Sequence, residues 1–229
     1  MMQMDFILEN TMNAVILACT SLTEYVKQAQ ANMGTSYPVL YLDRSYHKDP
    51  KMMRQQVLMA LEDIPEEYDT VLVAMGYCGG SWEGIPADRR IVLPRVDDCI
   101  SLLMTVDDLY MPDRKEEGCL YVKEEHPHLS SFRAIFESYT EDMEQDVANK
   151  IHAAWKENYH GMRVIDTGMY DCRTDAYMES VYADADWLEA ETKYVPGSVY
   201  ILEKLVSGQW DEQFAVIDEG ETITSEVYF

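Results

Sequence analysis

Residues Ala14–Ala18 read AVILA, a run of apolar side chains with no polar residue inside it. A strand with one face in water alternates apolar and polar residues, whereas a strand covered on both faces is apolar throughout. The run ends at Cys19, and a helical pattern then continues to about Met33 before Gly34. Ser21 and Glu24 have the spacing of a capping box at the start of that helix. We therefore expect a buried parallel strand followed directly by a helix.

The alternation of strand and helix continues through the first half of the chain. A second strand is expected at Val39–Leu42, and Asp49 and Pro50 are suited to be the N-cap and first residue of the next helix. Further strands are expected at 70–75 and 90–93. This order predicts an α/β fold, a Rossmann-like three-layer sandwich with a mostly parallel sheet.

The second half of the chain has a less regular pattern. We expect a strand at 118–123, a helical region from Ser130 or Ser131 to Gly161, a strand at 163–166, helices near 176–188 and 198–206, and a late strand at 214–217. No linker-like segment interrupts the chain, so residues 1–229 are interpreted as one α/β domain. Two lobes, about 1–110 and 111–229, sharing one cleft are the alternative arrangement.

Charge and cysteine content exclude several classes of function. The chain has 18 Lys and Arg residues against 42 Asp and Glu, a net charge of −24, which repels nucleic-acid phosphates and anionic lipid. No segment has the roughly 20 apolar residues that span a bilayer, and the first residues lack the basic start of a signal peptide. We therefore expect a cytoplasmic protein that binds neither nucleic acid nor membrane. Its five cysteines are then free thiols, metal ligands or catalytic groups, because an odd and dispersed set is not a disulfide framework.

Four soft ligands or nucleophiles follow the four strands expected in the first half of the chain. In open α/β sheets, ligands bind outside the carboxyl ends of the strands, and the ends of parallel strands share one edge. Thiolates with one imidazole suit zinc, another soft transition metal or an iron–sulfur cluster. The alternative is that each thiol only packs in the core. The spacing is not C-x-x-C, so the predicted metal site depends on strand position; its members are Cys19, His47, Cys78 and Cys99.

Residues beside these four suggest how a ligand is held. Gly76, Gly79 and Gly80 permit close approach of the backbone to a ligand, although the segment matches neither common nucleotide-binding motif. Arg95 is suited to neutralise an anionic ligand or a thiolate. Asp98 is suited to cap the helix that begins at Cys99. The catalytic candidates are Cys78, Arg95 and Asp98.

Other chemically active residues carry weaker signals. Cys119 lies inside an expected strand and is interpreted as core, and His126 and His128 flank Pro127 as a weak metal clip. The segment from Asp166 to Cys172 follows a later strand and is a further candidate for the edge that carries Cys19.

The segments ACTSL, LDRSYH, GYCGG, LPRVDDC, VIDTGMYD and SGQWDEQFAVIDEG together resemble the domain of unknown function family 1638. The family pattern corresponds to Cys19, His47, Cys78, Pro94, Arg95, Asp98 and Cys99. The segment GCLYVKEEHPHL departs from it, since the family has a Gly-Thr-Tyr-Tyr strand and a Pro-Gly-Trp there. The resemblance implies a role in strict anaerobes, near corrinoid-dependent methyl-transfer systems, with contact to a corrinoid or a methyltransferase protein.

Three functions are consistent with these features. The first is a metal-binding protein of corrinoid or methyl-transfer metabolism with a three-cysteine, one-histidine site. The second is a metal-independent thiol enzyme or small-molecule binder that uses one of the same cysteines, activated by Arg95 or a helix N-terminus. The third is an acidic accessory protein that docks on a partner enzyme.

Overall fold

The computed structural model describes residues 12–123, 126–127 and 131–229. The chain forms two compact units. The first unit contains the residues up to Asp97 together with Leu202–Phe229, and the second unit is Asp98–Ile201, inserted between them. The C-terminal segment thus rejoins the first unit, so the units divide the chain differently from the lobes 1–110 and 111–229.

The first unit is built on a five-stranded sheet with the strand order β2-β1-β3-β4-β8. Strands β1, β2, β3 and β4 are parallel to their neighbours, and β8 pairs with β4 in the antiparallel direction. These strands match the apolar runs of the sequence; β1, β3 and most of β4 are buried, whereas the two edge strands, β2 and β8, are partly exposed. Their bounds are β1 (Ala14–Cys19), β2 (Val39–Leu42), β3 (Thr70–Ala74), β4 (Arg90–Pro94) and β8 (Phe214–Ile217).

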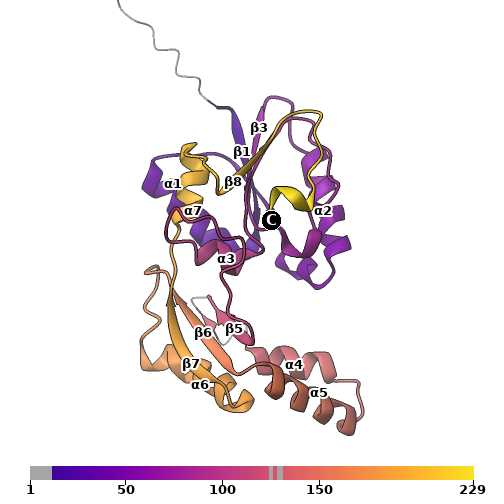
Figure 1. Cartoon of the computed structure of the whole chain (residues 1–229), viewed down its shortest axis with the longest axis vertical. Helices are drawn as coiled ribbons and strands as arrows, with labels where there is room; N and C mark the ends of the chain where they lie inside the picture. The colour runs from indigo at the N-terminus through magenta and orange to yellow at the C-terminus, as the bar shows by residue number, and fades with distance from the viewer. Residues whose placement is uncertain (1–11, 124–125, 128–130) are drawn as a thin grey trace, which may run out of the picture. The chain divides into compact units, whose positions relative to one another are not determined.

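Helices cover both faces of this sheet, as the apolar strands require. Helix α2 (Pro50–Glu62) lies on one side, and α1 (Thr23–Met33) and α7 (Tyr200–Ser207) lie on the other (Figure 1). Asp49 caps α2 by accepting a hydrogen bond from the Lys51 N–H, with Pro50 as its first residue, as predicted. The first unit is therefore the Rossmann-like three-layer sandwich predicted from the sequence.

Alternate residues of β1 face opposite layers. Leu17 and Cys19 belong to a buried cluster that also contains Met53 and Val57 of α2. All six residues of β1 are buried, including those that face the α1 side. The Cys19 side chain therefore lies in the layer between the sheet and α2.

The second unit has its own three-stranded parallel sheet, in the order β5-β6-β7. Helix α6 packs on this sheet through Met178, Val181 and Ala185, which share a buried cluster with Met162 and Val164 of β6. No helix of the described residues is long and apolar enough to cross a membrane. The elements of this unit are α3 (Cys99–Leu103), β5 (Cys119–Val122), α4 (Phe132–Thr140), α5 (Gln145–Asn158), β6 (Gly161–Asp166), α6 (Asp175–Leu188) and β7 (Glu191–Pro196).

The single helical region expected up to Gly161 is two helices, α4 and α5. Ser131 caps α4, as one of the two expected starting residues, while Ser130 lies outside the described residues. Phe136 and Trp155 would be roughly 28 Å apart along one straight helix. Their ring centroids are 5.3 Å apart, because the chain reverses after Thr140 so that both rings pack together.

Two further local features differ from the sequence prediction. Strand β7 was not predicted, since its residues are half-buried or exposed and it is defined by backbone pairing with β6. The capping box of Ser21 and Glu24 does not form. Helix α1 begins after a 3₁₀ turn, Thr20–Leu22, and Glu24 pairs with Lys27 instead, at 2.7 Å.

The buried position of β1 predicts that two paired leucines contribute very differently to the free energy of unfolding. Leu17 is 0 % exposed, whereas its register partner Leu40 on β2 is 37 % exposed. We expect Leu17→Ala to lower the free energy of unfolding by about 2–5 kcal/mol, because it removes buried methyl groups and leaves a cavity. Leu40→Ala is the matched control and is expected to cost about 1 kcal/mol or less. Urea denaturation measures both, and equal losses would contradict the assignment of β1 as a strand buried on both faces.

Candidate functional site

Cys19 and His47 form a hydrogen-bonded pair at the carboxyl edge of the first sheet. The Cys19 Sγ atom lies 3.3 Å from His47 Nε2. Ser21 adds two donors to the same sulfur, its hydroxyl at 3.2 Å and its backbone N–H at 3.5 Å. Cys19 is fully buried, whereas His47 is exposed. The sulfur is therefore a buried acceptor surrounded by polar donors.

The register of β1 with β2 explains why these two residues meet. Cys19 pairs with Leu42, so the segments that follow both strands start at the same edge of the sheet. Asp43 accepts a hydrogen bond from the Ser45 N–H and so caps the 3₁₀ turn that carries His47. This turn is tied to the one after β1, because the Arg44 N–H donates to Thr20 Oγ1 at 2.9 Å. The juxtaposition expected for Cys19 and His47 is thus present, while a metal-ligand role stays a prediction.

The environment favours the thiolate form of Cys19. Burial raises the pKa of the thiol, but the hydrogen bonds from His47 and Ser21 outweigh burial and hold that pKa below its ordinary value. In Cys119 and Cys172, burial is the largest effect and the thiol pKa lies above its ordinary value. Buried structural thiols are normally inert in this way. Cys19 therefore has the electrostatic character of a reactive cysteine, and Cys119 and Cys172 do not.

Cys78 follows β3 in a strained backbone conformation. Its φ angle is +49°, a left-handed conformation that costs a non-glycine residue of the order of 1 kcal/mol or more. Hydrogen bonds fix the turn, since the Cys78 N–H donates to the Asp97 carbonyl at 2.7 Å and Ser81 Oγ donates to the Cys78 carbonyl at 2.7 Å. Cys78 is half-buried against the cluster that contains Cys19. A role for Cys78 as a metal ligand or catalytic thiol stays a prediction.

The glycine-rich turn has a structural explanation of its own. Gly79 and Gly80 have φ angles of +67° and +94°, and Gly76 is buried. A Cβ atom on Gly79 would lie 3.3 Å from Pro50 Cγ, so the glycine lets the turn approach the start of α2. A cofactor-binding role for these three glycines stays a prediction.

Aromatic residues of the C-terminal segment adjoin Cys78, which sequence patterns did not reveal. The Tyr228 ring is fully buried and lies 4.6 Å from the ring of Tyr77, whose hydroxyl donates to Glu83 at 2.8 Å. Burial and then the nearby Cys78 thiol raise the pKa of Tyr228 well above its ordinary value. The residues after β8 lack any periodic pattern, so only their return to the sheet could identify them.

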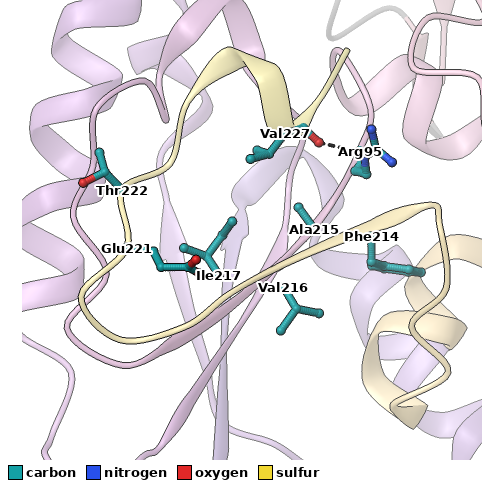
Figure 2. Close-up of a pocket in the computed structure, with 8 residues that line it drawn as sticks. All are labelled: Arg95, Phe214, Ala215, Val216, Ile217, Glu221, Thr222 and Val227. Carbon is teal, nitrogen blue, oxygen red and sulfur yellow. Dashed lines mark hydrogen bonds between the residues drawn. The ribbon is translucent and has the colours of Figure 1, made fainter.

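Arg95 binds the C-terminal segment. Its Nε donates to the Val227 carbonyl at 2.7 Å and its Nη1 to the Glu212 carbonyl at 2.9 Å. Figure 2 shows Arg95 at the side of a cavity of about 370 Å³ whose wall is formed by β8, with the bond to Val227 dashed. These contacts tie the residues on both sides of β8 to the end of β4. A role for Arg95 with a thiolate, anion or cofactor stays a prediction.

Asp98 and Cys99 belong to the second unit. The Asp98 carboxylate accepts hydrogen bonds from the N–H groups of Ile100 and Ser101 and pairs with Lys115 at 3.1 Å. Asp98 is therefore the predicted N-cap of α3, and Cys99 is the first residue of that helix.

The segment from Asp166 to Cys172 follows β6, which belongs to the three-stranded sheet. The expectation that it shares the sheet edge of Cys19 is thus wrong, because the two strands are in different sheets. Cys172 is buried there, and Asp166 pairs with Arg173 at 2.8 Å.

Within residues 12–123, 126–127 and 131–229, no group of three or more His, Cys, Asp or Glu side chains is arranged to hold a metal ion. His126 is exposed, and His128 lies outside the described residues. The Cys19–His47 pair supplies two possible metal ligands, and a metal site needs at least one further ligand. The chemistry that the pair can perform by itself is that of an activated thiol.

Comparison with known proteins identifies the family of the chain. A family model described as a protein of unknown function, DUF1638, matches residues 41–206, which is more than two thirds of the chain. The match includes His47, Cys78 and Cys99 and begins after Cys19. No curated protein and no solved structure matches the chain.

The lowered pKa of Cys19 predicts how stability depends on pH. Between that pKa and the ordinary thiol value near 9.0, the unfolded chain binds a proton at Cys19 that the native protein does not. The free energy of unfolding therefore gains a contribution that rises with pH through this window, is complete above it and is lost as pH falls through the native pKa. We expect the difference in unfolding free energy between wild type and Cys19→Ser to grow with pH in this range. Urea denaturation at a series of pH values measures it, with Cys172→Ser as the control; a difference that is constant or falls with pH would refute the lowered pKa.

Proposed function

The chain belongs to the DUF1638 family of proteins of unknown function, and we propose that it is a thiol-dependent enzyme with Cys19 as its nucleophile. The observation that carries this proposal is the 3.3 Å contact between the buried Cys19 Sγ and His47 Nε2. A thiol next to a histidine is one of the arrangements that activate cysteine for nucleophilic catalysis.

The donors around Cys19 support a functional role over simple packing. A cysteine that only fills space needs no polar donors. In Cys172, burial is the largest effect and raises the thiol pKa. Cys19 instead accepts from the His47 ring and from both the hydroxyl and the N–H of Ser21. These donors stabilise a negative charge on sulfur, which would otherwise be costly in a buried position.

In the proposed reaction, the Cys19 thiolate attacks an electrophilic carbon of a small molecule and forms a carbon–sulfur bond. The bond from that carbon to its leaving group breaks, and the leaving group takes the electron pair. His47, which holds the proton released by the thiol, delivers it from Nε2 to the leaving group. Among the described residues, His47 Nδ1 has no hydrogen-bond partner, so the proposed site is a dyad without a third orienting group.

Burial of Cys19 makes substrate entry dependent on His47. The sulfur is inaccessible to solvent, and the exposed His47 side chain is in contact with it. A substrate that reaches Sγ therefore displaces the imidazole from its present position. The turn that carries His47 is exposed over most of its length, which favours such a movement.

A metal-dependent function is the competing proposal, with Cys19 and His47 as two ligands of a zinc, another soft transition metal or an iron–sulfur cluster, linked to corrinoid or methyl-transfer chemistry. It requires further ligands, for which Cys78 and Cys99 are the sequence-based candidates. Metal analysis of anaerobically purified protein separates the two proposals. Stoichiometric metal that is lost in both Cys19→Ala and His47→Ala would favour the metal site, and metal-free protein with a reactive Cys19 favours the thiol enzyme.

Alkylation by iodoacetamide under native conditions tests the thiol proposal. We expect a carbamidomethyl adduct at Cys19, located by peptide mass spectrometry, whose rate of formation reaches half its maximum below the ordinary thiol pKa. His47→Ala should move this midpoint to higher pH, because the largest pKa-lowering contact is lost, even if the smaller side chain speeds access.

Cys119 provides the internal reference for this experiment. Its pKa is raised by burial, so its alkylation midpoint should lie above that of Cys19 in the same sample. A Cys19 midpoint equal to that of Cys119, or one that His47→Ala leaves unchanged, would rule out activation of the thiol by His47.

A further inference from the structure

The second unit contains a cavity that is remote in sequence from the Cys19–His47 pair and unrelated to it. It has a volume of about 390 Å³, within the range of small-molecule sites, and lies among α4, α5 and the end of α6. Phe136, His152 and Trp187 contribute one aromatic side chain from each of the three helices. Glu137 of α4 and Glu141, which caps the C-terminus of that helix, line the same cavity.

The three rings form one continuous aromatic surface. His152 stacks on Trp187 with centroids 4.2 Å apart and planes 10° apart, and Phe136 lies 5.1 Å from Trp187 and 5.6 Å from His152. A hydrogen-bond contact of 3.1 Å between His152 Nε2 and the Trp187 carbonyl fixes this arrangement. The rings are therefore held in place before any ligand binds.

Packing of the aromatic rings against one another does not fill the space beside them. Phe136 is buried, but His152 and Trp187 are only half-buried and border open space. In a fully packed core, such space is filled by side chains. The cavity therefore offers aromatic surface to a solute.

The charged side chains around the cavity indicate which charge a bound solute should carry. Both ionisable carboxylates of its wall, Glu137 and Glu141, are exposed. Glu137 also pairs with Arg133 one helical turn earlier, at 2.8 Å, which leaves Glu141 as the stronger source of negative potential. Among the described residues that line the cavity, none is Lys or Arg. Aromatic faces next to carboxylates are the environment that attracts an organic cation.

We propose that this cavity binds a small organic cation, a quaternary or protonated alkylammonium compound. The cation lies against the rings of Phe136, His152 and Trp187, and its charge is balanced by Glu141 and, more weakly, by Glu137. The amide of Asn149 also lines the cavity and can bind a polar substituent of the same ligand. This site is independent of the proposed thiol chemistry, since every residue in it belongs to the second unit.

Titration of the full chain with choline tests the proposal, observed through the indole N–H signal of Trp187 in two-dimensional NMR. The neutral isostere 3,3-dimethylbutan-1-ol has the same shape without the charge and is the ligand control. We expect choline to shift the Trp187 signal in a saturable manner and the isostere to bind at least about fivefold more weakly, the effect of a cation–π contact of about 1 kcal/mol.

Two Glu→Gln variants, which keep the shape of the side chain and remove its charge, separate the role of the cavity from that of the overall acidic charge. Glu141→Gln removes a carboxylate of the cavity and should weaken choline binding about two- to fivefold, as for an exposed ion pair. Glu157→Gln removes an exposed carboxylate of α5 that does not line the cavity, and should leave binding unchanged. Equal binding of choline and its isostere, equal effects of both variants, or no shift of Trp187 up to the solubility of choline would each overturn the proposal.

Discussion

Complete burial of β1 is the constraint on which the arrangement of the first unit depends. Every residue of Ala14–Cys19 is buried, so the strand has a neighbour on each side and a helical layer on each face. Its pairing with β2 then brings the turn after Leu42 beside Cys19. A thiol at the end of such a strand lies in a water-poor layer but within reach of the donors in the turns that follow. The Cys19–His47 pair is thus a direct consequence of strand register.

Sequence patterns predicted the parts of the fold that depend on apolar burial or on capping. The runs that became β1, β3 and β4 are apolar because the sheet is covered on both sides there, and Asp49 with Pro50 marked the start of α2. Strand β7 carries no such signal, since its side chains are half-buried or exposed and only its backbone pairing defines it. The reversal between α4 and α5 was also missed, because it depends on which aromatic rings pack together.

The candidate site was predictable in part. The positions of the strand ends correctly indicated that Cys19 and His47 meet. They did not indicate that Ser21, which was expected to cap a helix, donates hydrogen bonds to the Cys19 sulfur instead. Arg95 was expected to neutralise an anion, which stays a prediction; sequence patterns did not indicate that its guanidinium binds carbonyl groups more than a hundred residues later in the chain. Contacts of that kind depend on where the C-terminal segment returns, which local patterns do not specify.

The strong negative charge of the chain contributes to the electrostatic potential at both proposed sites. With 42 acidic residues against 18 basic ones, the average potential disfavours another anion, including a thiolate. At physiological salt this average field is screened beyond about 8 Å, so the donors in direct contact with Cys19 decide its charge. For a cation in the second unit, the same background is favourable, and the aromatic surface supplies the selectivity.

Contact with His47 is the main cause that lowers the pKa of the Cys19 thiol below its ordinary value, against the opposing effect of burial. The most direct measurement is an NMR titration of protein labelled with ¹³C at the cysteine Cβ, because it reports thiol protonation without a reagent that must enter the site. We expect the Cys19 signal to titrate below the ordinary thiol pKa and His47→Ala to move its midpoint upward. A Cys19 signal that titrates at or above the ordinary value in the wild-type protein would contradict it.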